Sequence, residues 1–146
     1  MTTQVDLLDL VGQPMGRTDW HQITQPQVNL FADATRDYQW IHVDPQRAKA
    51  GPLGGTIAHG YHTLALAPLF LAETVSIEHL TAGLNYGLNS VRFPAPVPVG
   101  AHVRAQVTLV AARERSIGIE AIFAISVELD GSTRPACVAE VIVLYQ

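Results

Sequence analysis

The feature that most constrains the fold is a strict alternation of apolar and other residues over residues 117–129. The apolar side chains at every second position are Ile117, Ile119, Ala121, Phe123, Ile125, Val127 and Leu129. Because successive side chains of a strand point to opposite faces, this spacing predicts a strand with one face in the core. Residues 102–110 repeat the pattern, and the almost continuously apolar residues 136–145 predict a strand covered on both faces.

A different pattern fills residues 60–75, which are apolar on nearly all sides and lack a polar stripe. It predicts a helix buried on most faces, with a bend at Pro68 because proline removes one backbone hydrogen bond. Residues 84–93 predict a strand that changes phase midway, and residues 17–23 predict a short early strand. Together these elements predict an α+β fold with an antiparallel sheet wrapped around one long central helix. The strands follow one another too closely for crossover helices, which argues against a parallel doubly wound sheet.

Length and composition fit one globular domain. A chain of 146 residues can bury a full core but is short for two, so a single domain over residues 1–146 is expected. Hydrophobic residues make up 48% of the chain and charged residues 15%, a balance that favours burial of apolar surface in an oligomer. Cys137 lies in an apolar run and is expected to be a small buried side chain.

Charge and hydropathy argue against several partners. The net charge of −4, with no cluster of Lys or Arg, predicts no nucleic-acid partner. The N-terminus lacks the basic and apolar regions of a secretory signal, and the most apolar run, residues 64–72, is far too short to span a bilayer. We therefore expect a cytoplasmic protein with no membrane partner.

The first half of the chain contains an acid and a base on an irregular segment. Asp37 and His42 are five positions apart and can supply a proton donor and a proton acceptor. Short helices are expected on both sides, at residues 28–35 and 44–48, because a capping box precedes the first and an Asp-Pro pair opens the second. Irregular connections of this kind are often functional. Gly60 would open the long apolar helix, where free backbone N–H groups attract an anion.

Three successive segments resemble the signatures of the MaoC-like hydratases, the R-specific enoyl-CoA hydratases of the hotdog fold. They are residues 31–44 (FADATRDYQWIHVD), 54–60 (GGTIAHG) and 86–100 (YGLNSVRFPAPVPVG). The resemblance implies a MaoC-like hotdog subunit, usually paired into a homodimer. It also implies reversible hydration of trans-2-enoyl-CoA to (R)-3-hydroxyacyl-CoA, with coenzyme A as part of the substrate and no further cofactor.

The same resemblance implies roles for individual residues. Asp37 and His42 match the catalytic dyad, and Gly60 matches the residue whose amide contacts the thioester oxygen. Arg36 stands where the family usually has glycine, and Gln39-Trp40 where it usually has Asn-Pro, so the pocket shape and acyl preference are open. The residues expected to bind substrate are Ile57, Ala58, His59, Tyr61, Asn85 and Arg92.

Some of these residues have a second interpretation. Asn85 and Arg92 fit a solvated strand face or an interface at least as well as a contact with phosphate or pantetheine. His59 also fits a structural hydrogen-bonding role at the start of the helix. His59 and His62 flank Gly60, but no further Cys or carboxylate cluster completes the three or four ligands that zinc needs, so no metal is expected.

Hydration needs one group to take a proton from water as the water attacks C3, and a group to deliver a proton to C2. The sequence does not decide which of Asp37 and His42 is the acid and which the base. An amide at Gly60 would stabilise charge on the thioester oxygen, by roughly 3 to 4 kcal/mol per donor.

Three other functions stay open. The same site could dehydrate 3-hydroxyacyl groups on acyl carrier protein, although this acidic, charge-poor chain offers little for a basic docking patch. A hotdog thioesterase would hydrolyse the acyl-CoA, but such enzymes commonly place a carboxylate on the central helix, where only Glu73 is available. A non-catalytic acyl-binding module is the third.

Overall fold

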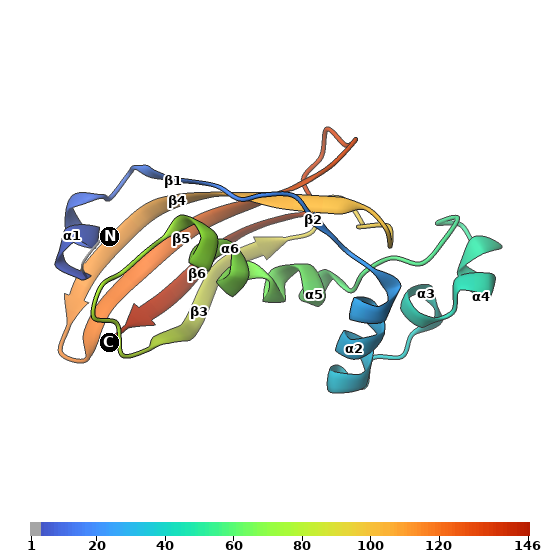
Figure 1. Cartoon of the computed structure of the whole chain (residues 1–146), viewed down its shortest axis with the longest axis horizontal. Helices are drawn as coiled ribbons and strands as arrows, with labels where there is room; N and C mark the ends of the chain where they lie inside the picture. Colours follow the sequence, from blue (N-terminus) through green and yellow to red (C-terminus); the bar gives the residue numbers. More distant parts are fainter. Residues whose placement is uncertain (1–3) are drawn as a thin grey trace.

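The computed structural model describes residues 4–146, and within this range the chain forms short helices and one sheet (Figure 1). The helices are α1 (Gln4–Asp9), α2 (Gln25–Thr35), α3 (Trp40–Val43), α4 (Pro45–Lys49), α5 (Gly60–Ala65) and α6 (Ala67–Thr74). The strands are β1 (Pro14–Arg17), β2 (His21–Gln22), β3 (Gly83–Arg92), β4 (His102–Arg115), β5 (Gly118–Leu129) and β6 (Cys137–Tyr145).

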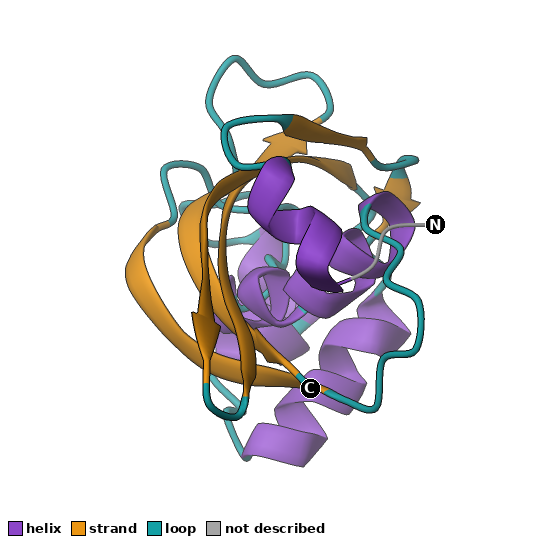
Figure 2. Cartoon of the chain, turned by 90° about the vertical axis from the view of Figure 1, so that its left-hand side faces the viewer, coloured by secondary structure: helices purple, strands orange, loops and turns teal. Residues whose placement is uncertain are grey.

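All strands belong to one antiparallel sheet. Its order is β1-β4-β5-β6-β3, and β2 pairs with β4. The long strands curl around the helices, with α5 and α6 crossing the concave side of the sheet (Figure 2). The expected α+β fold, with an antiparallel sheet wrapped around a central helical segment, is confirmed.

The alternating strand pattern places the core. Phe123 of β5 pairs with Leu109 of β4 and with Val141 of β6, and the side chains of Phe123 and Leu109 are fully buried. Phe70 of α6 packs into the same cluster and is also fully buried. Burial of one such side chain stabilises the fold by about 1.5–3 kcal/mol. The helical segment therefore packs against the face of the sheet that the alternation predicts to lie in the core.

The central helix differs from the prediction. Instead of bending at Pro68, it breaks into α5 and α6 at Leu66, and Pro68 lies in the first turn of α6, where its missing N–H costs nothing. The helical segment is also less buried than its composition predicts, because Leu69 is 40% exposed.

Several strand and helix boundaries also differ. The early strand predicted at residues 17–23 forms as two shorter strands, β1, which overlaps this range only at Arg17, and β2, which lies within it. Helix α1 has no counterpart in the prediction. Ile117 lies outside β5 and is exposed, because Gly118 turns the chain with a φ of 146°. Val138 of β6 is exposed, so this strand is not covered throughout on both faces. The phase change expected in β3 is confirmed by register shifts on both sides of Leu88.

Two further expectations concern single features. Cys137 is buried as predicted, and burial raises the pKa of its thiol to about 11. Among residues 4–146, no helix is long and apolar enough to cross a membrane.

Candidate active site

The segment that carries the acid and the base leaves the sheet at one end. Helices α2, α3 and α4 lie beyond the strands, at the end of the sheet where α5 begins (Figure 1). The predicted capping box opens α2, because the Thr24 side chain accepts a hydrogen bond from Gln27 and the Gln27 side chain accepts one from the Thr24 N–H. Asp44 caps α4 by accepting from the N–H of Arg47, as the Asp-Pro pair predicts. The expected helices on both sides of Asp37 and His42 are confirmed.

The sequence predicts irregular backbone at His42. In the structure His42 lies instead in the one-turn helix α3. Its side chain is buried, with 6% exposed. Nδ1 lies 2.7 Å from the carbonyl oxygen of Ile57, and since a carbonyl only accepts, Nδ1 carries the proton in this contact. In the neutral ring Nε2 is then left with a lone pair, so it can accept a proton.

The surroundings of His42 favour this neutral ring. Burial lowers the pKa of His42 below its usual value of 6.5, and it outweighs the hydrogen bond to Ile57, which raises the pKa. The charges of His59 and Asp37 have smaller effects, and these oppose each other. At neutral pH His42 is therefore a base with one free nitrogen.

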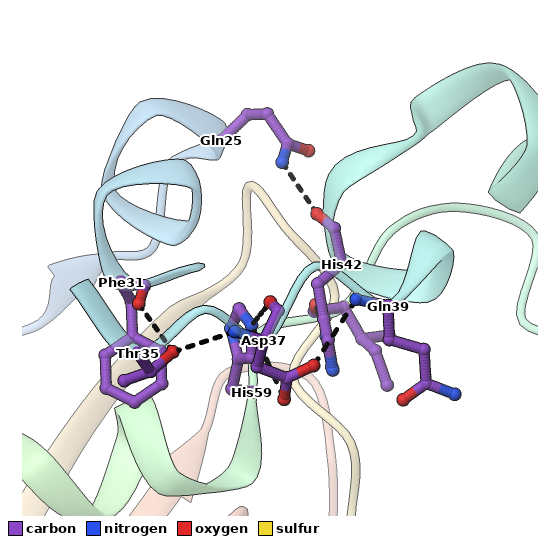
Figure 3. Close-up of polar contacts among 8 residues, drawn as sticks. Gln25, Phe31, Thr35, Asp37, Gln39, His42 and His59 are labelled. Atoms are coloured by element: carbon purple, nitrogen blue, oxygen red, sulfur yellow. Dashed lines mark hydrogen bonds and ion pairs between the residues drawn. The ribbon is translucent and has the colours of Figure 1, made fainter. Parts of the chain in front are cut away.

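Asp37 follows the end of α2 directly. Arg36 ends that helix in the left-handed conformation, with a φ of 64°, which explains why glycine would suit this position. The Asp37 carboxylate is about half exposed and accepts a hydrogen bond from the N–H of Gln39 at 3.3 Å. The Asp37 N–H in turn donates to the Thr35 hydroxyl at 3.3 Å (Figure 3). A half-exposed carboxylate thus lies close to a buried neutral imidazole.

His59 joins the two residues. Its Nε2 lies 3.0 Å from the backbone oxygen of Asp37 and 3.9 Å from a carboxylate oxygen of the same residue. Its ring stacks on the ring of His42, with centroids 3.8 Å apart and an interplanar angle of 23° (Figure 3). One possible metal-ligand atom from each of Asp37, His42 and His59 lies within 4.8 Å of the other two.

The ring geometry bears on whether these three residues could hold a metal. Zinc lies about 2.0–2.1 Å from an imidazole nitrogen, along a lone pair in the ring plane. Two rings stacked at 3.8 Å with only 23° between them cannot both point a lone pair at one ion. His42 Nδ1 and His59 Nε2 are also engaged with carbonyl oxygens. The arrangement fits proton transfer better than metal binding.

A pocket of about 220 Å³ opens beside His42 and Gly60. Its other lining residues are Ile57, Ala58, Thr63, Phe93, Ala95, Pro96, Val97 and Ala136. Most of this lining is apolar, which suits the uncharged part of a ligand. Gly60 is the first residue of α5, so its N–H has no partner within the helix. A Cβ at Gly60 would lie 3.3 Å from the Phe93 ring, so glycine keeps this side of the pocket open.

The structure brings together some of the residues expected to bind substrate. Ile57 and Ala58 line the pocket, whereas His59 is buried, with 3% exposed, and is not part of the lining. Tyr61 is 71% exposed and lies near Phe93, with ring centroids 6.1 Å apart.

Asn85 and Arg92 lie on β3, outside the lining of this pocket. Asn85 lines a separate hollow between α6 and β3. The exposed Arg92 donates to the carbonyl oxygen of Val91. Within residues 4–146, neither side chain joins the group around His42.

Sequence reasoning did not find a polar network behind the dyad. Gln25 donates to the backbone oxygen of His42 at 2.8 Å, and its own oxygen accepts from the Thr56 hydroxyl at 2.7 Å. Thr56 is buried, so its hydroxyl needs this partner. The only sequence signal is the position of Thr56 within the segment 54–60 that ends in Gly60. Phe93 also lines the pocket, whereas the sequence places it only in the predicted strand at residues 84–93 and in the segment 86–100.

Comparison with known proteins identifies the family of this chain. Residues 6–127 match the family model described as "MaoC like domain". The chain belongs to the MaoC-like family. A relative from Mycobacterium tuberculosis named 3-hydroxyacyl-thioester dehydratase Z is 54% identical over 141 residues, which are 96% of this chain and 93% of the relative. Nodulation protein N of Rhizobium leguminosarum bv. viciae is 40% identical over 144 residues, covering 97% of this chain and 89% of the relative.

Solved structures of the MaoC-like family share the fold. The (R)-hydratase from A. caviae involved in PHA biosynthesis superposes with a TM-score of 0.76 at 26% identity, covering 93% of this chain and 96% of that one. The MaoC-like resemblance and the hotdog fold expected from the sequence are thus confirmed. The chain is an enzyme of the hydratase and dehydratase kind.

Proposed function

We propose that this enzyme adds water to trans-2-enoyl-CoA to give (R)-3-hydroxyacyl-CoA, and catalyses the reverse dehydration. The observation that carries the proposal is the position of His42, a neutral imidazole that lies close to the Asp37 carboxylate and lines an apolar pocket together with Gly60. The named activities of the Mycobacterium tuberculosis relative and of the A. caviae structure support the same chemistry.

In the proposed reaction, Nε2 of His42 and the carboxylate of Asp37 hold one water molecule. The water oxygen forms a bond to C3 while one of its protons passes to Nε2, and the electron pair of the C2=C3 bond moves toward the thioester carbonyl. The dyad then returns one proton to C2, so it ends in its starting protonation state. Proton transfers by positioned side chains contribute about 10² to 10⁴ in rate each.

The Gly60 N–H is proposed to stabilise the negative charge that develops on the thioester oxygen. Helix α5 has only six residues before the break at Leu66, so the aligned dipole of a long helix adds less here than the unbroken helix expected from the sequence. The hydrogen bond itself therefore accounts for most of the effect, at roughly 3 to 4 kcal/mol for one donor. The reaction moves only water and protons, so we predict that it needs no further cofactor. The cytoplasmic location also stays a prediction.

The test is to follow the loss of enoyl absorbance of crotonyl-CoA with the purified protein and to determine the configuration of the product. We expect (R)-3-hydroxybutyryl-CoA, and a loss of at least about 100-fold in kcat for His42→Ala and for Asp37→Asn. An S product, or full activity in His42→Ala, would sink the assignment. Repeating the assay with crotonyl groups on acyl carrier protein decides between the two thioester carriers.

A thioesterase is the main alternative, and one contact argues against it. Glu73 is the only carboxylate of α5 and α6, and it lies 2.6 Å from Nε2 of His21, near the far end of α6. It is absent from the lining of the pocket beside Gly60. Release of free thiol at the rate of substrate loss would favour hydrolysis over hydration. Ligand binding without any turnover would instead indicate a binding module.

We further propose that the enzyme is a homodimer in which β3 lies at the interface. This ten-residue strand is at one end of the sheet order, and its large side chains Leu84, Tyr86 and Leu88 are 44%, 49% and 44% exposed. A long apolar edge strand is normally covered. Light scattering should give twice the mass of the chain, and Leu88→Lys should shift the protein toward monomer. A monomeric parent protein at micromolar concentration would contradict the proposal.

A further inference from the structure

His59 makes contacts that do not fit a simple substrate-binding side chain. It is 3% exposed and immediately precedes Gly60, as the residue before the first turn of α5. Its Nε2 lies 3.0 Å from the backbone oxygen of Asp37, and a carbonyl oxygen can only accept a hydrogen bond. The Nε2 atom therefore carries a proton. Nδ1 is buried and has no hydrogen-bond partner among the described residues, so the hydrogen bonding of this ring runs through Nε2.

Two aromatic rings also contact the His59 ring. The His42 ring stacks against it at 3.8 Å, and the Phe31 ring of α2 lies at 4.8 Å with a tilt of 53°. Buried aromatic contacts of this kind restrict the rotation of each ring. The orientation of the His42 imidazole is thus limited by His59 as well as by its hydrogen bond to Ile57.

Other contacts hold Asp37 only loosely. Its N–H and its carboxylate each make a hydrogen bond of 3.3 Å, both with residues two positions away in the chain. The His59 contact is shorter, and it joins Asp37 to a segment 22 residues further along. Without it, the turn after α2 would be free to shift relative to α5.

We propose that His59 is a positioning residue, which fixes Asp37 and His42 relative to the Gly60 N–H and does not itself exchange protons with the substrate. This inference rests on the proposed hydration. Residues 57–60 then hold the whole site: the oxygen of Ile57 orients His42, the ring of His59 orients both members of the dyad, and Gly60 supplies the anion-binding N–H. The geometry of the reaction is set by one short segment rather than by the helices that carry the acid and the base.

Two substitutions separate the hydrogen bond from the ring contact. His59→Phe keeps a flat ring against His42 but has no N–H for Asp37, whereas His59→Gln keeps an N–H donor and loses the ring. His62→Phe is the matched control, because His62 is another buried histidine of α5 whose ring stacks on Phe31 rather than on the dyad. Thermal unfolding of all three variants reports whether each one folds.

The kinetic readout is the split between kcat and KM in crotonyl-CoA hydration. We expect His59→Phe to lower kcat by about 10- to 100-fold with KM within about threefold of the parent, the cost of a displaced catalytic group. His59→Gln should recover part of the loss, and His62→Phe should stay within about threefold of the parent. Equal kcat values for His59→Phe and the parent, or equal losses in His59→Phe and His62→Phe, would overturn the proposal.

A measurement on the parent protein does not depend on activity or on folding of a variant. Nitrogen-15 NMR distinguishes the two neutral tautomers of histidine, and the proposal requires the proton on Nε2 of His59 and on Nδ1 of His42 at neutral pH. The opposite tautomer at His59 would overturn it, even if His59→Phe did not fold. A parent protein that leaves crotonyl-CoA unchanged would count against the proposed function alone, since the tautomers can still be read.

Discussion

Nδ1 of His42 lies 2.7 Å from the carbonyl oxygen of Ile57, so the buried imidazole presents Nε2 as its free nitrogen. The two residues come from different parts of the chain, α3 and the segment before α5. Their hydrogen bond fixes the tautomer, which in other histidine sites decides which nitrogen can act as a base. The pH at which the enzyme works should follow from the charge of this one ring.

The acid side of the pH profile should report His42. Burial lowers the pKa of His42 below 6.5, so the ring stays neutral and able to accept a proton down to that lower pKa. Activity should therefore be flat from pH 8 to about pH 6.5 and fall only at lower pH, with one proton taken up. The measurement is kcat/KM for crotonyl-CoA between pH 4.5 and 8.5, with His42 titrated in parallel by NMR. An activity loss that begins well above pH 6.5 would contradict the assignment of the acid side of the profile to His42.

Arg36→Gly should stabilise the fold. Arg36 has a φ of 64° at the end of α2, a conformation that costs an L-residue about 1–2 kcal/mol and glycine almost nothing. The flexibility that glycine adds to the unfolded chain offsets part of the gain, which leaves roughly 1 kcal/mol. Denaturant unfolding measures the difference. Arg36→Ala is the control, because it removes the charge and keeps the strain; if it is as stable as Arg36→Gly, the backbone explanation fails.

The sequence predicted those features that depend on neighbouring residues. The alternation in β5, the capping box at Thr24 and the Asp44-Pro45 start of α4 are local patterns, and each forms as expected. Asp37, His42 and Gly60 also come from local motifs: Asp37 lies close to His42, and His42 lines one pocket with Gly60. Local chemistry was sufficient in these places.

The features that the sequence did not predict depend on distant contacts. The hydrogen bond from Thr56 to Gln25 joins residues 31 positions apart, and no spacing rule points to it. The 40% exposure of Leu69 depends on which distant parts of the chain pack against α6, and the local pattern does not specify this.

Gln25 and Thr56 should behave as a coupled pair. Gln25→Leu would leave the Thr56 hydroxyl and the backbone oxygen of His42 without their partner, so we expect a loss of about 1–3 kcal/mol in stability. Thr56→Val should cost about the same, because it leaves the Gln25 oxygen unpaired. The double variant should lose less than the sum of the two, measured by denaturant unfolding in a double-mutant cycle. Strict additivity would show that the hydrogen bond contributes nothing.

Gly60→Ala tests how closely the pocket is built around the first turn of α5. The added Cβ would lie 3.3 Å from the Phe93 ring, so either the ring or the helix start must move, and the Gly60 N–H would move with the helix. We expect a loss of up to about 10-fold in kcat/KM, because the required shift is smaller than the displacement of about 1 Å that can cost about 100-fold. Phe93→Leu combined with Gly60→Ala should recover part of the activity, since leucine gives the Cβ more room. The control is Gly55→Ala, whose Cβ meets no atom within 4 Å and should leave activity unchanged. If Gly60→Ala is as active as Gly55→Ala, the Phe93 ring gives way without moving the helix start, and the pocket is not closely built around Gly60.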